Sequence, residues 1–287
     1  MRRRQPTAGR FSNSFALVKA SANVLRMDKE LMAFPLMSGV ATVLIAASFI
    51  TPVVMTGGWE ALAEDGSSSY FEYAVGFLFA LVQSTVILFF NAALVGAALI
   101  CLDGGDPTVS DGLAIAGKRM GAILGYAALA ATVGMVLRFI SERSGFIGRL
   151  ISGFVGMTWS LATYLTVPVL VAKDIGPIDA VKESAALLRQ TWGEQVIGNF
   201  GLGWTFMMAA ISWGLVSTVL IAGTVSILPA GAVFPALGVA VLGFVFLVLF
   251  FSALKGVYTA ALYRYAVTGE DSLFDPEIVG SAFRSKR

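Results

Sequence analysis

The stretch "TVPVLVAKDIGPIDAVKESAALLRQTW", residues 166–192, contains the transition that decides the fold. It starts inside a long apolar run, passes Lys173 and Asp174, and restarts at Gly176 and Pro177. Pro177 suits the first turn of a helix, where an N–H group has no intrahelical partner to lose. The apolar residues that follow recur at steps of three and four, which predicts one helical face. These residues are Ile178, Val181, Ala185, Leu188 and Trp192.

This stretch therefore predicts a membrane span that turns into an amphipathic surface helix and then into the next span. The composition of the whole chain agrees, because 57% of the 287 residues are hydrophobic and 13% are charged. Soluble domains carry about 25% charged residues. A membrane-crossing helix needs about 20 predominantly apolar residues. Six runs qualify, at about 31–56, 71–102, 120–138, 150–172, 196–224 and 232–254.

The fold class that follows is an all-α polytopic membrane protein with six transmembrane helices. We divide it into a cytoplasmic segment with an interfacial helix (1–30), a six-helix membrane domain (31–266) and a cytoplasmic tail (267–287). Lys and Arg accumulate in the cytoplasmic loops of membrane proteins. The six spans place 17 of these residues on one side and three on the other. We therefore expect a multi-pass protein of the plasma (inner) membrane with both termini cytoplasmic.

A weak repeat predicts three tandem units, each made of a surface helix and a transmembrane hairpin. The surface helices are expected near 11–25, 107–119 and 177–192. Amphipathic helices with flanking basic residues lie in the headgroup interface. The expected contacts with anionic lipid headgroups are Lys19, Arg26, Lys182 and Arg189. The alternative reading is that these helices are linkers packed on the floor of the bundle.

Several kinds of chemistry are excluded by what the sequence lacks. It has no histidine and a single cysteine, Cys101. Histidine is the commonest general base and the commonest transition-metal ligand, and one cysteine makes neither an internal disulfide nor a cysteine-based metal cluster. We therefore predict no catalytic residues, no metal, no cofactor, no enzymatic activity and no nucleic-acid partner.

Polar side chains inside the spans are costly in hydrocarbon and usually face a bundle interior. Three of them, Gln83, Asn91 and Asn199, are candidates to line a pore. Pro168 lies within the fourth span, where a proline bends or breaks a helix. At the outer end of the third span Arg138 and Glu142 stand one helical turn apart, which predicts an ion pair.

Glycines at four-residue steps open the third span, at Gly117, Gly121 and Gly125. Small residues at this spacing allow helices to approach closely. We favour packing within the bundle over a dimer interface for them.

Residues 158–198, "TWSLATYLTVPVLVAKDIGPIDAVKESAALLRQTWGEQVIG", resemble a segment found in an uncharacterised family of prokaryotic six-helix integral membrane proteins. The segment is also similar to the membrane domain of some glycerophosphodiester phosphodiesterases and, more loosely, to Yip-type membrane proteins. The chain contains no counterpart of the soluble phosphodiesterase domain, so the resemblance implies a fold and no activity. The matching positions are Pro168, Asp174, Gly176, Pro177, Ala180, Ser184, Trp192 and Gly193.

These observations favour a non-enzymatic membrane component that organises lipid or partner proteins. The alternative is a channel or uncoupled transporter lined by uncharged polar residues. The expected partners are the lipid bilayer with its anionic headgroups, and either a second copy of the chain or another membrane protein.

Overall fold

The computed structural model describes residues 21–22, 24–25, 28–55, 70–227 and 233–268, apart from the side chains of 70–73 and 190–202. Every regular element within these residues is helical, which confirms the all-α class. The elements are η1 (Lys29–Met32), α2 (Ala33–Met55), α4 (Tyr70–Leu102), α5 (Val109–Lys118), α6 (Met120–Arg143), α7 (Gly145–Ala162), α8 (Thr166–Ala172), α9 (Pro177–Ile227) and α10 (Val233–Thr268).

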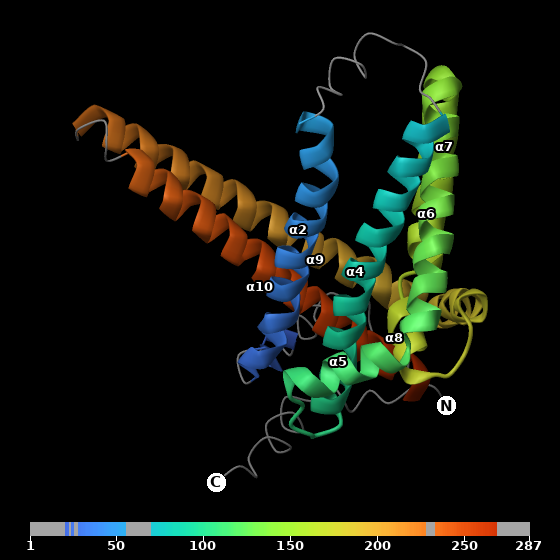
Figure 1. The fold of residues 1–287 in the computed structure, drawn as a ribbon. Coiled ribbons are helices and arrows are strands. Elements are labelled where there is room, and N and C mark those ends of the chain that lie inside the picture. The colour runs from blue at the N-terminus through green and yellow to red at the C-terminus, as the bar shows by residue number, and fades with distance from the viewer. Residues whose placement is uncertain (1–20, 23, 26–27, 56–69, 228–232, 269–287) are drawn as a thin grey trace. The chain divides into compact units, whose positions relative to one another are not determined.

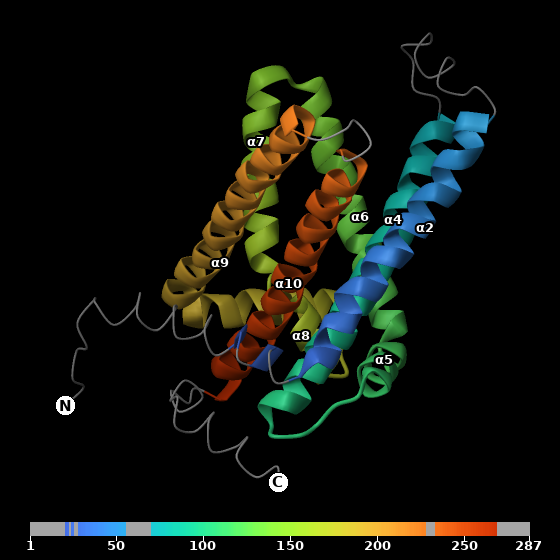
Figure 2. The ribbon, with the colours of Figure 1, turned by 90° about the vertical axis from the view of Figure 1, so that its left-hand side faces the viewer.

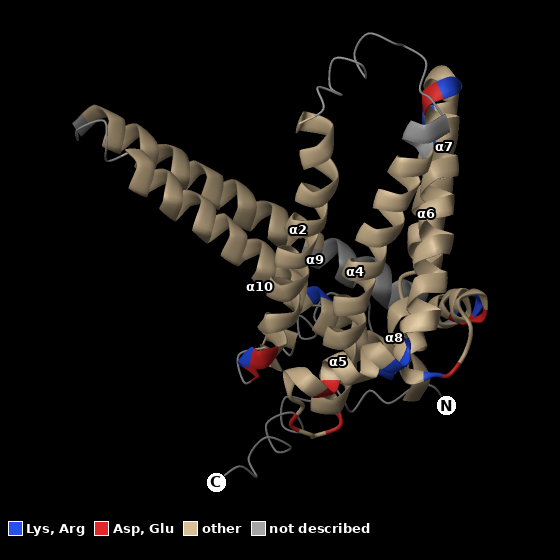
Figure 3. Cartoon of the chain, viewed as in Figure 1, with Lys and Arg blue, Asp and Glu red and all other residues tan. Residues whose placement is uncertain are grey.

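Among the described residues, six helical stretches are long and apolar enough to cross a membrane, as the sequence predicts. They are Lys29–Met55, Ala74–Leu102, Met120–Arg143, Gly145–Ala172, Gly203–Ser226 and Val233–Thr268. Charged residues gather at the ends of α6 and α7 and around α5 and α8, and the stretches of α4 and α6 between them carry none (Figure 3).

The chain forms two compact units. The core unit is Ala33–Gln190, and the hairpin unit combines Met1–Met32 with Thr191–Arg287. In the core unit α4 is the central helix and packs against α2, α5, α6 and α8 (Figures 1 and 2). Small residues allow this close approach, because α4 is fully buried over the stretch 92–98, "AALVGAA". A Cβ atom on Gly96 would lie 2.9 Å from Cγ2 of Ile115 on α5.

The third and fourth spans meet in a much tighter turn than the sequence predicts. We expected a loop over 139–149, but α6 continues to Arg143 and α7 begins at Gly145, so that Ser144 alone connects them. Gly145 has φ +57°, a left-handed conformation that glycine adopts without steric cost. The predicted ion pair is confirmed, since Arg138 Nε donates to Glu142 Oε1 at 2.7 Å.

In the hairpin unit α9 and α10 run antiparallel. The indole Nε1 of Trp213 donates to the carbonyl oxygen of Ala240 at 2.9 Å. Further along the pair, the rings of Phe206 and Phe251 meet edge to face, with centroids 5.2 Å apart. Gly243 lies against the Trp213 ring, where a side chain would collide with it. The short helix η1 packs against α10 in the same unit.

Two predicted helix boundaries are wrong. The surface helix at 177–192 and the fifth span form one continuous helix, α9, because the glycines between them weaken a helix without ending it. The sixth span continues to Thr268 rather than 254, so Lys255 lies inside α10.

The repeat is also less regular than the sequence predicts. Pro177 is the first residue of α9, as expected, whereas α5 begins two residues after Pro107, with Thr108 as its N-cap. Of the first surface helix, expected near 11–25, the structure describes only 21–22 and 24–25, which are helical.

Candidate functional site

The fourth span is interrupted in the core unit. Helix α7 ends at Ala162 and α8 begins at Thr166, so that Thr163–Leu165 form a break between them. Pro168 explains where the break lies. A proline ring clashes with the carbonyl group four residues earlier, here that of Tyr164, and a proline nitrogen has no N–H to donate to that carbonyl. The predicted bend at Pro168 is thus a full interruption one turn before the proline.

The break leaves a backbone N–H group that another helix satisfies. The N–H of Leu165 donates to Ser184 Oγ on α9 at 3.0 Å, and both residues are 0% exposed. Irregular backbone at membrane depth is tolerated only where it is buried in protein or lines a water-filled cavity. The hydroxyl of Ser184 therefore makes the break compatible with a buried position.

Helix α6 lies beside the same region, since it packs against α7. The side chain of Tyr126 on α6 is buried there. One residue earlier, a Cβ atom on Gly125 would lie 3.0 Å from Cγ of Pro177. The absence of a side chain at Gly125 thus gives room for the first residue of α9.

Ion pairs hold the linker between α8 and α9. Arg119, between α5 and α6, pairs with Asp174, and Lys173 pairs with Glu183 on α9. The exposed pair of Lys182 and Asp179, at 3.1 Å, lies within α9 itself. We call the break, the linker and the first turns of α9 (177–189) the joint.

The joint collects most of the residues that carry the resemblance. Ala180 N donates to the carbonyl oxygen of Gly176 at 3.0 Å and so closes the first turn of α9. The side chain of Trp192 and the surroundings of Gly193 lie outside the description. The motif residues that the joint brings together are Asp174, Gly176, Pro177, Ala180 and Ser184, while Pro168 lies in α8, between the break and the linker.

The structure divides the predicted apolar stripe of the surface helix between a buried and an outward side. The side chains that the structure buries are Ala180, Ser184, Leu187 and Leu188. This face is rotated from the predicted stripe because the hydrogen bond of Ser184 and the contact of Pro177 fix how the helix sits. Ile178 is consequently 59% exposed. Together with the half-buried Val181 and Ala185 it forms an outer strip that the described residues cover only in part.

Basic residues flank the outer strip. Lys182 and Arg189 are exposed, as expected of lipid contacts, and Lys19 and Arg26 lie outside the described residues. Lys118 and Arg119 were not among the expected lipid contacts, although they lie directly before the third span.

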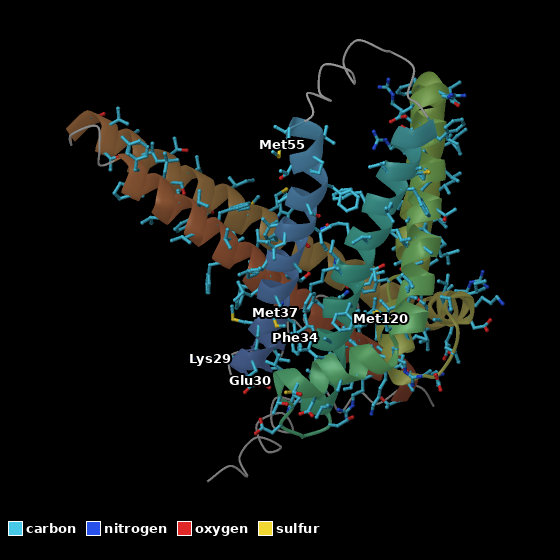
Figure 4. All side chains as sticks on the ribbon, viewed as in Figure 1. Lys29, Glu30, Phe34, Met37, Met55 and Met120 are labelled. Atoms are coloured by element: carbon cyan, nitrogen blue, oxygen red, sulfur yellow. The ribbon has the colours of Figure 1, made fainter. Side chains whose placement is uncertain are left out.

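The neighbouring helix α5 follows the alternative reading of a packed linker. Its buried face holds Gly112 and Ala116 and rests on α4 and on Phe34 of α2. A Cβ atom on Gly112 would meet Phe34 Cζ at 2.5 Å and the Ala93 carbonyl oxygen at 2.8 Å. Phe34 lies at the base of α2, close to α5 (Figure 4).

At the start of α5 an aspartate caps the helix. Thr108 and Asp111 form a capping box, in which Asp111 Oδ2 accepts from the Thr108 N–H at 2.9 Å. The hydrogen bonds from the backbone and side chain of Thr108 lower the pKa of the Asp111 carboxyl. Asp111 is therefore a structural residue.

The three pore candidates are not brought together by the described side chains. Gln83 and Asn91 lie about two turns apart on α4, and the side chain of Asn199 lies outside the description. The Oε1 atom of Gln83 is buried and accepts no hydrogen bond from the described residues. Asn91 is half-buried.

The hydroxyl groups of the joint have no histidine nearby, since the chain contains none. The described residues contain no group of three or more acidic or sulfur side chains that could hold a metal ion.

Comparison with known proteins gives one match. A protein-family model described as a family of unknown function (DUF6159) matches residues 70–273. This range includes the joint and five of the six candidate spans. No curated protein and no solved structure matches the chain.

Proposed function

We propose that this chain, which belongs to the family of unknown function DUF6159, is a non-enzymatic membrane component that organises anionic phospholipid. The six apolar helices make it a multi-pass membrane protein. In the proposed arrangement it lies in the inner membrane, with both termini and the joint on the cytoplasmic side. The basic bias of the corresponding loops supports this orientation.

The observation that carries the proposal is the outer strip on the first turns of α9. Ile178 is 59% exposed, whereas Ala180 and Ser184 on another face of the same turns are buried. Lys182 and Arg189 stand beside it, exposed. Helices that lie in the membrane interface typically combine two kinds of side chain. Apolar side chains enter the acyl region, and neighbouring cations reach the headgroup phosphates.

The charges of this surface favour anionic lipid. A basic residue at the membrane surface contributes about 1 kcal/mol of attraction to an anionic leaflet. Lys182 is paired with Asp179, an exposed pair that contributes little and leaves the ammonium group accessible. Arg189 makes no ion pair with any other described residue.

A charge reversal tests the proposal. In nanodiscs that mix phosphatidylcholine with phosphatidylglycerol, we expect Lys182→Glu with Arg189→Glu to lower the phosphatidylglycerol retained by the purified protein about tenfold. Retention is measured by mass spectrometry of the lipid that remains after delipidating washes. The matched control is Arg143→Glu with Arg149→Glu, at the opposite ends of the third and fourth spans, which is expected to have a smaller effect. Equal retention by the wild type and the 182/189 variant would contradict the proposal.

The interrupted fourth span supports the second candidate, a channel or uncoupled transporter. Discontinuous helices form the substrate sites of many transporters, and Gln83 carries a buried oxygen without a described donor. Ionic current across planar bilayers distinguishes this candidate, with Asn91→Leu as the control. Discrete conductance steps that this substitution alters would favour the channel over the lipid-organising role. The relationships to the glycerophosphodiester phosphodiesterase membrane domain and to Yip-type proteins stay predictions.

A further inference from the structure

Arg119 and Asp174 meet where three segments of the core unit converge. Arg119 is the single residue between α5 and α6, and Asp174 lies in the linker between α8 and α9. One candidate span begins at Met120 and another ends at Ala172. Both charged side chains are therefore within two residues of a span end, at the depth where a bilayer places its headgroup phosphates.

The two partners are unequally covered. The side chain of Arg119 is 23% exposed, whereas that of Asp174 is 92% exposed. An ion pair in which one partner is almost fully hydrated is weak. A carboxylate at this depth also experiences the negative surface potential of an anionic leaflet. The arginine is thus fixed by its surroundings, while its present partner is easily exchanged.

We propose that the phosphate of an anionic phospholipid headgroup replaces the carboxylate of Asp174 on the guanidinium of Arg119. This inference rests on the proposed function and names a headgroup site that is separate from the outer strip. Guanidinium binds phosphate through two parallel N–H···O hydrogen bonds, which are stronger than neutral ones. Asp174 remains hydrated after release, so its loss of a partner costs little.

The surroundings of Arg119 accommodate a headgroup. Lys118 adds a second cation next to it and makes no ion pair with any described residue. Gly117 and Gly121 lie two residues to either side, both exposed, and a Cβ atom on either would meet nothing within 4 Å. The backbone near Arg119 is thus open to the lipid.

The exchange has a local structural consequence. Asp174 ties the α8–α9 linker to the corner between α5 and α6, whereas Ser184 and Pro177 hold α9 through independent contacts. Binding of lipid phosphate therefore loosens the linker at Ile175 and Gly176 and leaves the break at Leu165 unchanged. Hydrogen exchange of these amides separates the two regions.

Retained lipid and hydrogen exchange test this site, in nanodiscs of phosphatidylcholine with or without phosphatidylglycerol. We expect Asp174→Asn, which removes the competing carboxylate, to raise retained phosphatidylglycerol up to about fivefold. We expect Arg119→Gln to lower it by a similar factor, and Lys118→Gln, with the same charge change, to alter it less than about twofold. In the wild type, phosphatidylglycerol speeds exchange in the linker and not at Leu165. Thermal midpoints of all variants confirm folding.

Two results would overturn the exchange at Arg119 and leave the proposed function standing. The first is that Asp174→Asn behaves as the wild type, while Arg119→Gln loses no more lipid than Lys118→Gln. The second is that inorganic phosphate, added to phosphatidylcholine discs, speeds linker exchange as much as phosphatidylglycerol does, which would assign the site to free phosphate. If the wild type retained phosphatidylcholine and phosphatidylglycerol equally, that result would contradict both the proposed function and this inference.

Discussion

Replacing Gly112 with alanine is expected to lower the thermal midpoint of the detergent-solubilised protein by about 2–12 °C. The added Cβ atom would stand 2.5 Å from Phe34 Cζ and 2.8 Å from the backbone oxygen of Ala93. The end of a side chain can rotate away from an added methyl group, but the backbone oxygen of Ala93 cannot. Helix α5 must therefore shift away from α4 and from Phe34 on α2. Overpacking of this kind costs about 1–3 kcal/mol, and each kcal/mol corresponds to about 2–4 °C for a protein of this size.

The matched control lies on the same helix. Gly117→Ala adds the same methyl group where nothing lies within 4 Å. Alanine is favoured over glycine in a helix by about 1 kcal/mol, so the midpoint is expected to stay or rise slightly. If the two substitutions gave the same midpoint, the packing of α5 on α4 and α2 would be wrong.

Replacing Ser184 with alanine is expected to destabilise the joint by about 1–3 kcal/mol, the cost of a buried polar group left without a partner. The group is the N–H of Leu165, which donates to Ser184 Oγ and to no backbone oxygen of the described residues. We expect a lower thermal midpoint and faster hydrogen exchange around the break at Thr163–Leu165, since its cap is gone.

Ser152→Ala is the corresponding control in the fourth span. The hydroxyl of Ser152 bonds to the carbonyl oxygen of Arg149 in its own helix, at 3.1 Å, and its loss strands no buried N–H. We expect a free energy of unfolding within about 0.5 kcal/mol of that of the wild type. Unchanged exchange at the break in Ser184→Ala would show that Ser184 does not cap it.

The membrane class and the six spans could be predicted because composition alone decides them. A run of 20 apolar residues has few alternatives to crossing a bilayer. The local signals at Pro177 and Pro168 were also sufficient, since proline restricts the backbone by its own geometry. The pair of Arg138 and Glu142 followed from helical spacing.

The features that the sequence did not predict depend on contacts between distant segments. Arg119 and Asp174 are 55 residues apart, and no local pattern joins them. The division of the apolar stripe was not predicted, because apolar spacing shows which residues are apolar and not which of them the protein covers. Leu188 of the stripe is buried and Ile178 faces outward, since Ser184 determines the buried side.

The continuous helix α9 has a similar cause. Glycines between 192 and 203 resemble a boundary in sequence. A glycine costs a helix only about 1 kcal/mol, which the neighbouring turns can offset.

The central claim is that the outer strip of α9 lies in lipid, and a fluorescent label at Ile178 tests it most directly. Cys101 is the only cysteine, so Cys101→Ala gives a background in which Ile178→Cys or Asp179→Cys can each be labelled alone with a small environment-sensitive dye. The two positions are adjacent in the chain and differ by about 100° around the helix.

We expect the label at 178 to be quenched by lipids brominated near the top of the acyl chain, and the label at 179 to be quenched by aqueous iodide. Quenching of both labels by iodide, with no response to brominated lipid at 178, would place the strip in water and contradict the proposed function.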